Sequence, residues 1–163
     1  MEAITLEAIA DRAGVSTRTV LRRYGSREGV IEACIREDPA GIRQGRDAAS
    51  AGEVDEALAI LVRHYEEDGD AILRSLAVED QLEAAQMVVR EGRREHRSWC
   101  ERIFAPFLPP AGHAARQGAV DAVVAATDVY LWKLLRRDLK RSPDAVQGVM
   151  RKLLSGMISI ETG

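Results

Sequence analysis

The stretch of this chain that decides its fold is Ile4-Thr-Leu-Glu-Ala-Ile-Ala-Asp-Arg-Ala-Gly-Val-Ser-Thr-Arg-Thr-Val-Leu-Arg-Arg-Tyr24. Thr5 and Ser16 each stand just before a short amphipathic run, where a hydroxyl can accept from the free N–H groups of a first helical turn. Gly14 stands where the first run should end, in the left-handed conformation that glycine adopts without strain. The stretch therefore predicts two short helices joined by a glycine turn, a pattern typical of helix-turn-helix readers of the DNA major groove.

The apolar side chains of this stretch give each predicted helix an inner face. Those of the first helix recur at spacings of three and four residues and are Leu6, Ile9, Ala10 and Ala13. In the second helix, Val20 and Tyr24 share a face because they are four residues apart. We expect Val15, the apolar residue of the turn, to pack between the two helices.

The outer face of the second helix carries side chains suited to base edges. It presents Thr17, Arg18, Leu21 and Arg22. Arginine can form a bidentate pair with guanine, and a threonine or leucine methyl can touch the methyl group of thymine. We expect Ser26 to begin a third helix, whose free N–H groups can hold a phosphate.

Charge is distributed unevenly along the chain. Between Arg12 and Arg27 there are five arginines and no acidic residue, whereas the remainder has 18 basic and 26 acidic residues. A small basic element on an acidic body suits a protein that engages nucleic acid at one end. The alternative is a solvated helical face, which charge runs usually are.

Residues 5–28 resemble the DNA-binding signature of TetR-family transcriptional regulators. The resemblance is carried by Thr5-x-x-x-Ile9-Ala10-x-x-Ala13-Gly14-Val15-Ser16-x-x-Thr19-x-x-x-x-Tyr24-x-Ser26-Arg27-Glu28. Residues 126–139 also resemble the C-terminal half of many actinobacterial members. The resemblance implies an all-helical homodimer that responds to a ligand and most often acts as a repressor.

The same resemblance implies a set of DNA contacts. Bases would be contacted by Thr17, Arg18, Leu21 and Arg22, and phosphates by Thr19, Arg23 and Arg27. Members of the family normally have a further helix before the position where this chain begins. We therefore expect residues 1–38 to form a helix-turn-helix domain that lacks its usual first helix and relies on neighbouring contacts, because small units without a full core are marginally stable.

Composition limits what the rest of the chain can be. With 163 residues, of which 46% are hydrophobic, the chain can bury a core of its own. It has no apolar run of membrane-spanning length and no cationic, apolar leader. Its two cysteines, Cys34 and Cys100, show no metal-binding spacing, so we expect a reducing cytoplasm as its location. We expect no catalytic activity and no cofactor, since no catalytic triad order, phosphate loop or carboxylate pair appears.

The predicted fold class is all-α, an N-terminal helix-turn-helix followed by a C-terminal helical bundle. A linker over 39–53 should separate the reader from a body over 54–163. In the body we expect a helix over 54–67 that a break at residues 66–70 ends. A further helix should follow this break, and another should run over 80–104. One long helix is predicted over 115–139. Ser142-Pro143-Asp144 is a strong start signal for the last one.

The last two predicted helices carry broad apolar stripes. We expect them to form a four-helix dimer interface through Val120, Val123, Val124, Leu131, Val146, Val149, Met150, Leu153, Leu154 and Met157. The alternative is that both helices bury these residues within their own subunit. A dimer is favoured because a half-site reader gains affinity and a palindromic operator by pairing.

Polar and aromatic residues of the body suggest a pocket for a small, apolar effector. The candidate lining residues are His64, Tyr65, Asp68, Trp99, Phe104, Tyr130 and Trp132. The alternative is that the aromatic residues among them are simply core. The resulting hypothesis is a repressor that a small apolar effector releases from its operator.

Two other functions stay open at this point. His64 with Asp68, and His96 with Cys100, each share a helix face, and two such pairs could hold zinc in a metal-binding bundle. The arginines around His96 disfavour a cation there. The third possibility is a regulator-derived helical dimer module that does not bind DNA on its own.

Overall fold

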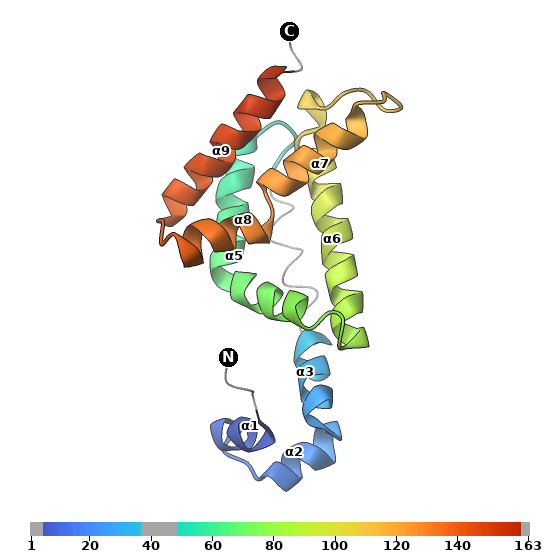
Figure 1. The fold of residues 1–163 in the computed structure, drawn as a ribbon, viewed down its shortest axis with the longest axis vertical. Helices are drawn as coiled ribbons and strands as arrows, with labels where there is room; N and C mark the ends of the chain where they lie inside the picture. Colours follow the sequence, from blue (N-terminus) through green and yellow to red (C-terminus); the bar gives the residue numbers. More distant parts are fainter. Residues whose placement is uncertain (1–4, 37–48, 161–163) are drawn as a thin grey trace.

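The computed structural model describes residues 5–36 and 49–160, and its secondary structure over these ranges is entirely helical (Figure 1). The predicted all-α class is confirmed. A small N-terminal unit lies at one end of an elongated molecule and a larger helical body at the other. The helices are α1 (Leu6–Ala13), α2 (Thr17–Tyr24), α3 (Arg27–Arg36), α5 (Val54–Ala77), α6 (Glu83–Ile103), α7 (Arg116–Ala126), α8 (Val129–Lys133) and α9 (Pro143–Ile160). A 3-10 turn, η1 (Ala105–Phe107), follows α6, and a π-helical turn, η2 (Leu134–Asp138), follows α8.

Local hydrogen bonds build the N-terminal unit as the sequence predicts. Thr5 Oγ1 accepts from Ala8 N at 3.2 Å, and Ser16 Oγ accepts from Thr19 N at 3.2 Å, so both hydroxyls cap their helices. Gly14 adopts φ 66°, and its N–H donates back to α1. These caps satisfy backbone donors that a short helix cannot satisfy itself. The helix-turn-helix is thus a product of local sequence.

α5 is a single helix of 24 residues, so the predicted break at residues 66–70 is wrong. Gly69, the strongest breaker in that segment, is buried where the ring of Trp132 crosses α5. A Cβ added at Gly69 would lie 2.6 Å from Cζ3 of that ring. Packing of a large ring against the bare backbone therefore offsets the low helix propensity of glycine.

The predicted helix over 115–139 is also wrong, because it is divided into α7, α8 and η2. Asp128 Oδ1 accepts from Tyr130 N at 2.8 Å and starts a new helix at that point. The carbonyl of Thr127, freed by the break, accepts from Tyr65 Oη at 3.0 Å. A side-chain cap on one side and a tertiary hydrogen bond on the other replace the missing helical bonds.

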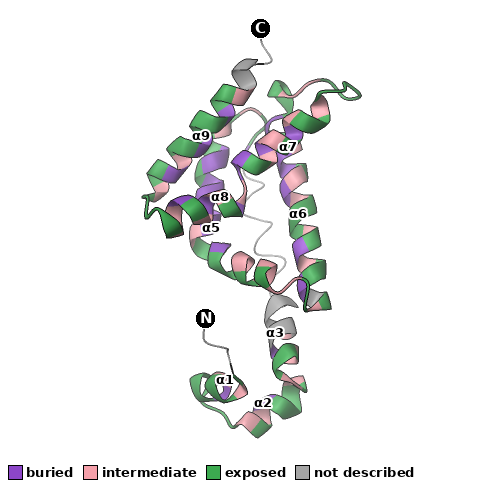
Figure 2. Cartoon of the chain, viewed as in Figure 1, coloured by how far each residue is buried: buried purple, intermediate pink, exposed green. Residues whose placement is uncertain are grey.

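The core of the body lies between α5, α6, α7, α8 and α9 (Figure 2). Its fully buried side chains include Trp132, Phe104, Leu58 and Met150. The predicted start of the last helix is confirmed, because Ser142 Oγ accepts from Ala145 N at 3.3 Å. No helix in the described residues is both long and apolar enough to span a membrane.

The predicted linker over 39–53 lies partly outside the described residues. Of its described part, Ala49 is buried, and Gly52 N donates to Ile103 O at 2.8 Å. Residues 49–53 thus lie against the C-terminal end of α6. α3 contacts α6 near the other end of that helix, close to the turn between α5 and α6 (Figure 1). α6 therefore lies beside both the N-terminal unit and the residues that enter the body.

Candidate functional site

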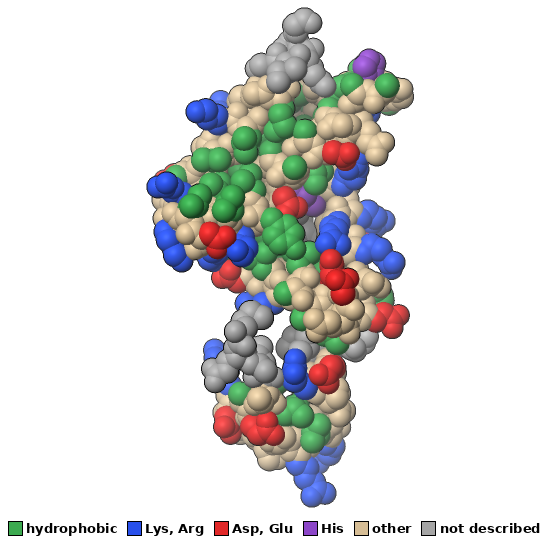
Figure 3. Space-filling view, in the orientation of Figure 1, with side chains coloured by type: hydrophobic (Ala, Val, Ile, Leu, Met, Phe, Trp, Pro, Cys, Tyr) green, Lys and Arg blue, Asp and Glu red, His purple; other side chains and the backbone are tan. Residues whose placement is uncertain are grey.

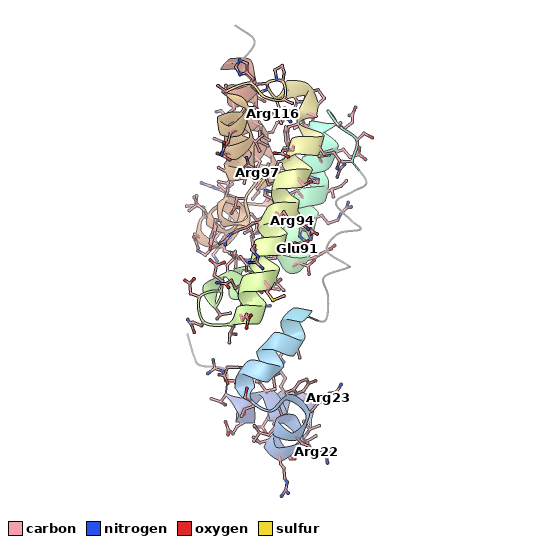
Figure 4. All side chains as sticks on the ribbon, turned by 90° about the vertical axis from the view of Figure 1, so that its right-hand side faces the viewer. Arg22, Arg23, Glu91, Arg94, Arg97 and Arg116 are labelled. Carbon is pink, nitrogen blue, oxygen red and sulfur yellow. The ribbon has the colours of Figure 1, made fainter. Side chains whose placement is uncertain are left out.

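The outer face of α2 is open to solvent at the far end of the molecule. Arg18 and Arg22 are exposed, Leu21 is 40% exposed, and Thr17 is half-buried. Figure 4 shows Arg22 pointing away from the body, beyond the end of the N-terminal unit. A helix that presents arginine, leucine and threonine in this way can reach into a DNA major groove.

Each of the three residues expected to contact phosphates interacts with another side chain of the N-terminal unit. Thr19 Oγ1 lies 2.9 Å from Ser16 Oγ, so its hydroxyl takes part in the cap of α2. The guanidinium of Arg23 lies over the Tyr24 ring, 5.4 Å from the centroid. Arg27 Nε is 3.9 Å from a carboxylate oxygen of Glu28. The side chains of Arg23 and Arg27 are exposed to solvent.

A small apolar cluster holds the N-terminal unit together. It consists of Ala10, Val20 and Val30, each buried, with Leu6, Ile9 and Tyr24 partly buried against it. The expectation that Val15 packs between the helices is wrong, since its side chain is 41% exposed. The positive φ of Gly14 turns the chain so that Val15 lies outside the cluster, and Val30 of α3 contributes the third buried side chain.

The tight joint between α2 and α3 depends on two glycines that the sequence interpretation did not use. Gly25 ends α2 with φ 78°, and its N–H donates to Leu21 O at 2.8 Å. A Cβ added at Gly29 would lie 2.0 Å from the carbonyl oxygen of Tyr24. Ser26 Oγ accepts from Gly29 N at 3.0 Å, which caps α3 as predicted. The local signal was present in the repeated glycines of residues 25–29.

Residues 1–34 match the family model described as bacterial regulatory proteins, tetR family. This N-terminal part of the chain is therefore similar to the DNA-binding unit of TetR-family regulators. The match supports a TetR-type DNA-binding regulator, and the matched residues contain the helix-turn-helix of α1 and α2. Comparisons of the chain with curated proteins and with solved structures find no match.

The residues expected to line an effector pocket divide into two groups. Five are buried between α5, α6 and α8, namely His64, Tyr65, Trp99, Phe104 and Trp132. Two pairs of these rings pack together: the ring centroids of Tyr65 and Trp132 are 5.9 Å apart, and those of Trp99 and Phe104 are 6.2 Å apart. Asp68 is half-buried, with Oδ2 3.3 Å from His64 Nδ1. Tyr130 is different, because it is 54% exposed on the outer surface.

Three buried polar side chains join this aromatic cluster, and sequence reasoning did not place them there. Thr127 Oγ1 lies 3.1 Å from His96 Nε2 and 3.5 Å from Cys100 Sγ. The Thr127 hydroxyl donates to Val123 O at 2.8 Å. Thr127 lies in the break between α7 and α8, 31 residues from His96, so no local pattern could have joined them. These three residues form a polar seam between α6 and the α7–α8 joint.

The two side-chain pairs considered for zinc lie on different helices and have different partners. His64 pairs with Asp68 on α5, whereas His96 and Cys100 on α6 approach each other to 3.8 Å beside Thr127. Within the described residues, no group of three or more potential metal ligands occurs. The side chain of Cys34 lies outside the described part of the chain.

The ten residues expected at a dimer interface also divide. Five are buried within the chain's own core: Val120, Val123, Val146, Met150 and Leu154. Val149 and Leu153 are exposed, while Val124, Leu131 and Met157 are half-buried. Figure 3 shows hydrophobic side chains gathered on the surface of α8 and α9. The exposed members of this apolar face are Tyr130, Leu134, Val149 and Leu153.

A cluster of charges and one aromatic ring ties α5 to α8 and η2. We call it the α5–α8 clamp and define it as Glu66, Asp70, Trp132, Arg136 and Arg137. Arg136 donates from Nε and Nη2 to the two oxygens of Glu66, both at 2.8 Å, and Trp132 Nε1 donates to Oε1 at 2.8 Å. Arg137 forms the same forked pair with Asp70, both bonds at 3.0 Å, and lies 4.4 Å above the Trp132 ring.

The clamp changes the acidity of its carboxyl groups. Hydrogen bonds from Arg136 lower the pKa of Glu66, and this outweighs the opposing effect of burial. The hydrogen bond from Arg137 lowers the pKa of Asp70 in the same way. Both acids are therefore held as carboxylates, the form that accepts the forked arginine bonds.

Proposed function

We propose that this chain is a homodimeric TetR-type repressor that a small apolar effector releases from a palindromic DNA operator. The observation that carries the proposal is the exposed outer face of α2, with Arg18, Leu21 and Arg22 open to solvent at the far end of the molecule. Direct base contacts need such side chains on a helix that protrudes from its scaffold. We assign base contacts to Thr17, Arg18, Leu21 and Arg22, and phosphate contacts to Thr19, Arg23 and Arg27.

Dimerisation is supported by the apolar face of α8 and α9. Tyr130, Leu134, Val149 and Leu153 are each at least 37% exposed, and an apolar surface of this kind is usually covered by a partner. In this proposal, the five interface candidates that are buried in the chain's own core lie beneath the apolar face, and only the exposed residues touch the second copy. A second copy would place two α2 helices in successive major grooves on one side of the duplex.

Ligand response is supported by the aromatic cluster and polar seam inside the body. Aromatic walls with a few polar groups are typical of small-molecule sites. α6 borders this region through Trp99 and Cys100, and α3 contacts the same helix nearer its N-terminal end. A shift of α6 on effector binding would therefore reorient the reader. Because coupling is reciprocal, operator DNA should weaken effector binding by the same factor.

The test is selection from a random pool of duplex DNA with the full chain. Enrichment of a palindrome supports the proposal, and enrichment of no sequence contradicts it, in favour of the alternative of a dimer module that does not bind DNA. Arg22→Ala should then weaken binding to the selected site by about 1–3 kcal/mol and relax the preference at one base position.

Arg90→Ala is the matched control, because Arg90 is also exposed but lies on α6 in the body. It should leave both affinity and preference unchanged. Equal affinity and equal preference for wild type and Arg22→Ala would remove Arg22 from the base-reading set.

A further inference from the structure

The indole N–H of Trp99 is a buried donor to which the structure assigns no acceptor. Trp99 is 4% exposed, and its Nε1 has no hydrogen-bond partner among the described residues. Buried polar groups are satisfied in nearly all native structures, and a buried donor that is not satisfied points to a water or a ligand that completes it. The other tryptophan follows the rule, since Trp132 Nε1 donates to Glu66 at 2.8 Å.

The hydroxyl and carbonyl groups of the neighbouring seam already take part in other hydrogen bonds. Tyr65 Oη donates to Thr127 O, and the Thr127 hydroxyl donates to Val123 O, which leaves its oxygen to accept from His96. If one of these groups moved to accept from Trp99 Nε1, it would lose a hydrogen bond that it forms within the polar seam. Among the described residues, no acceptor forms a hydrogen bond with the indole N–H, so a bound molecule is the candidate to supply one.

The surroundings of Trp99 define the molecule that could supply the acceptor. The His96 ring stacks on the indole at 5.7 Å with an interplanar angle of 16°, and Phe104 meets it edge-on at 6.2 Å. These contacts favour a flat, apolar body. The buried polar side chains in the described residues are His64, His96 and Thr127, so no Asp, Glu, Lys or Arg is buried there to pair with an ionic ligand. Burying an unpaired charge is strongly unfavourable.

We propose that Trp99 Nε1–H is the donor that recognises the effector, and that the effector is a neutral aromatic molecule carrying a hydrogen-bond acceptor such as a carbonyl oxygen. The inference rests on the proposed ligand response and specifies its chemistry. Trp99 is the specificity-determining residue, and the rings of His96 and Phe104 are the walls beside it.

The test uses two probes of nearly the same shape, acetophenone and α-methylstyrene, of which only the first carries an acceptor. The two indole N–H signals of the ¹⁵N-labelled full chain are assigned with Trp99→Phe and followed by NMR during titration. Acetophenone should shift the Trp99 signal and bind about two- to ten-fold more tightly than α-methylstyrene. The Trp132 signal is the internal control and should stay in place, because that N–H is occupied by Glu66.

Trp99→Phe keeps an aromatic ring but removes the donor, so both probes should bind it equally. The inference is wrong if neither probe shifts the Trp99 signal, if both shift it equally, or if the signal reports only a retained water. The wild-type titration decides the matter even where the variant fails to fold. DNA selection is independent: a chain that selects an operator but ignores acetophenone overturns this inference alone. A chain that binds acetophenone at Trp99 but selects no DNA contradicts only the proposed function.

Discussion

At the scale of single residues, the contact between Gly69 and Trp132 makes a testable demand on side-chain size. An added Cβ would meet the ring at 2.6 to 3.1 Å, and the ring is held by Glu66 on its N–H and by Arg137 over its face. Gly69→Ala should therefore lower the free energy of unfolding by about 1–3 kcal/mol, as overpacking of a core does. Urea denaturation followed by circular dichroism measures the change.

Gly92→Ala is the matched control for this substitution. Gly92 lies inside α6, and nothing lies within 4 Å of the position of an added Cβ. The same change there should raise the free energy of unfolding by about 0.5–1 kcal/mol, because alanine is the better helix former. Stabilisation of similar size in both variants would mean that the Trp132 ring does not constrain Gly69.

At the scale of elements, the clamp joins the middle of α5 to α8 and η2. Its Glu66 carboxylate has a pKa below the ordinary value of 4.5, chiefly because of the hydrogen bonds from Arg136. A group with a lowered folded pKa stabilises the fold above its unfolded pKa, and that contribution is lost as the pH falls through the folded pKa. Wild-type stability should therefore fall as the pH drops below 4.5, and Glu66→Gln should be less stable at pH 7 and depend less on pH over that window.

Glu67→Gln makes the same chemical change at the next residue of α5, which is exposed. Thermal unfolding of the three proteins between pH 7 and pH 3 makes the comparison. Glu67→Gln should follow the wild-type curve, with only Glu66→Gln departing from it. Parallel curves for wild type and Glu66→Gln would show that the clamp contributes no stability through this carboxylate.

At the scale of the whole molecule, the apolar face of α8 and α9 predicts the assembly state. Leu153 is 44% exposed on this face, so a glutamate there would bring two unpaired charges into a dimer contact. Leu153→Glu should be monomeric in sedimentation velocity at concentrations where wild type is dimeric. It should also lose affinity for a palindromic site, while single half-sites are bound as before.

The control for this variant is Met87→Glu. Met87 is more exposed, at 55%, but lies on α6, away from the apolar face. It should remain dimeric. A wild-type chain that sediments as a monomer at micromolar concentration would contradict the dimer itself, and dimeric Leu153→Glu would move the interface elsewhere.

The N-terminal unit could be predicted from the chain because its structure is made by near neighbours. Thr5, Ser16 and Ser26 each cap a backbone N–H three residues ahead, and Gly14 takes the positive φ that its place requires. Such bonds form within four residues, so the spacing of hydroxyl, glycine and apolar side chains is enough to specify them. The same holds for the start of α9 at Ser142.

The helix boundaries and the burial pattern of the body depend on contacts between residues far apart in the sequence, so local spacing does not predict them. Gly69 remains helical because Trp132 packs on it, and α7 ends at Thr127, whose carbonyl and hydroxyl bind Tyr65 and His96 from other helices. A stripe of apolar residues likewise does not say which members face inward, and burial of Met150 beside exposed Val149 depends on how α9 lies against α5. Periodicity sets the face of a helix, whereas packing between helices sets how much of that face is covered.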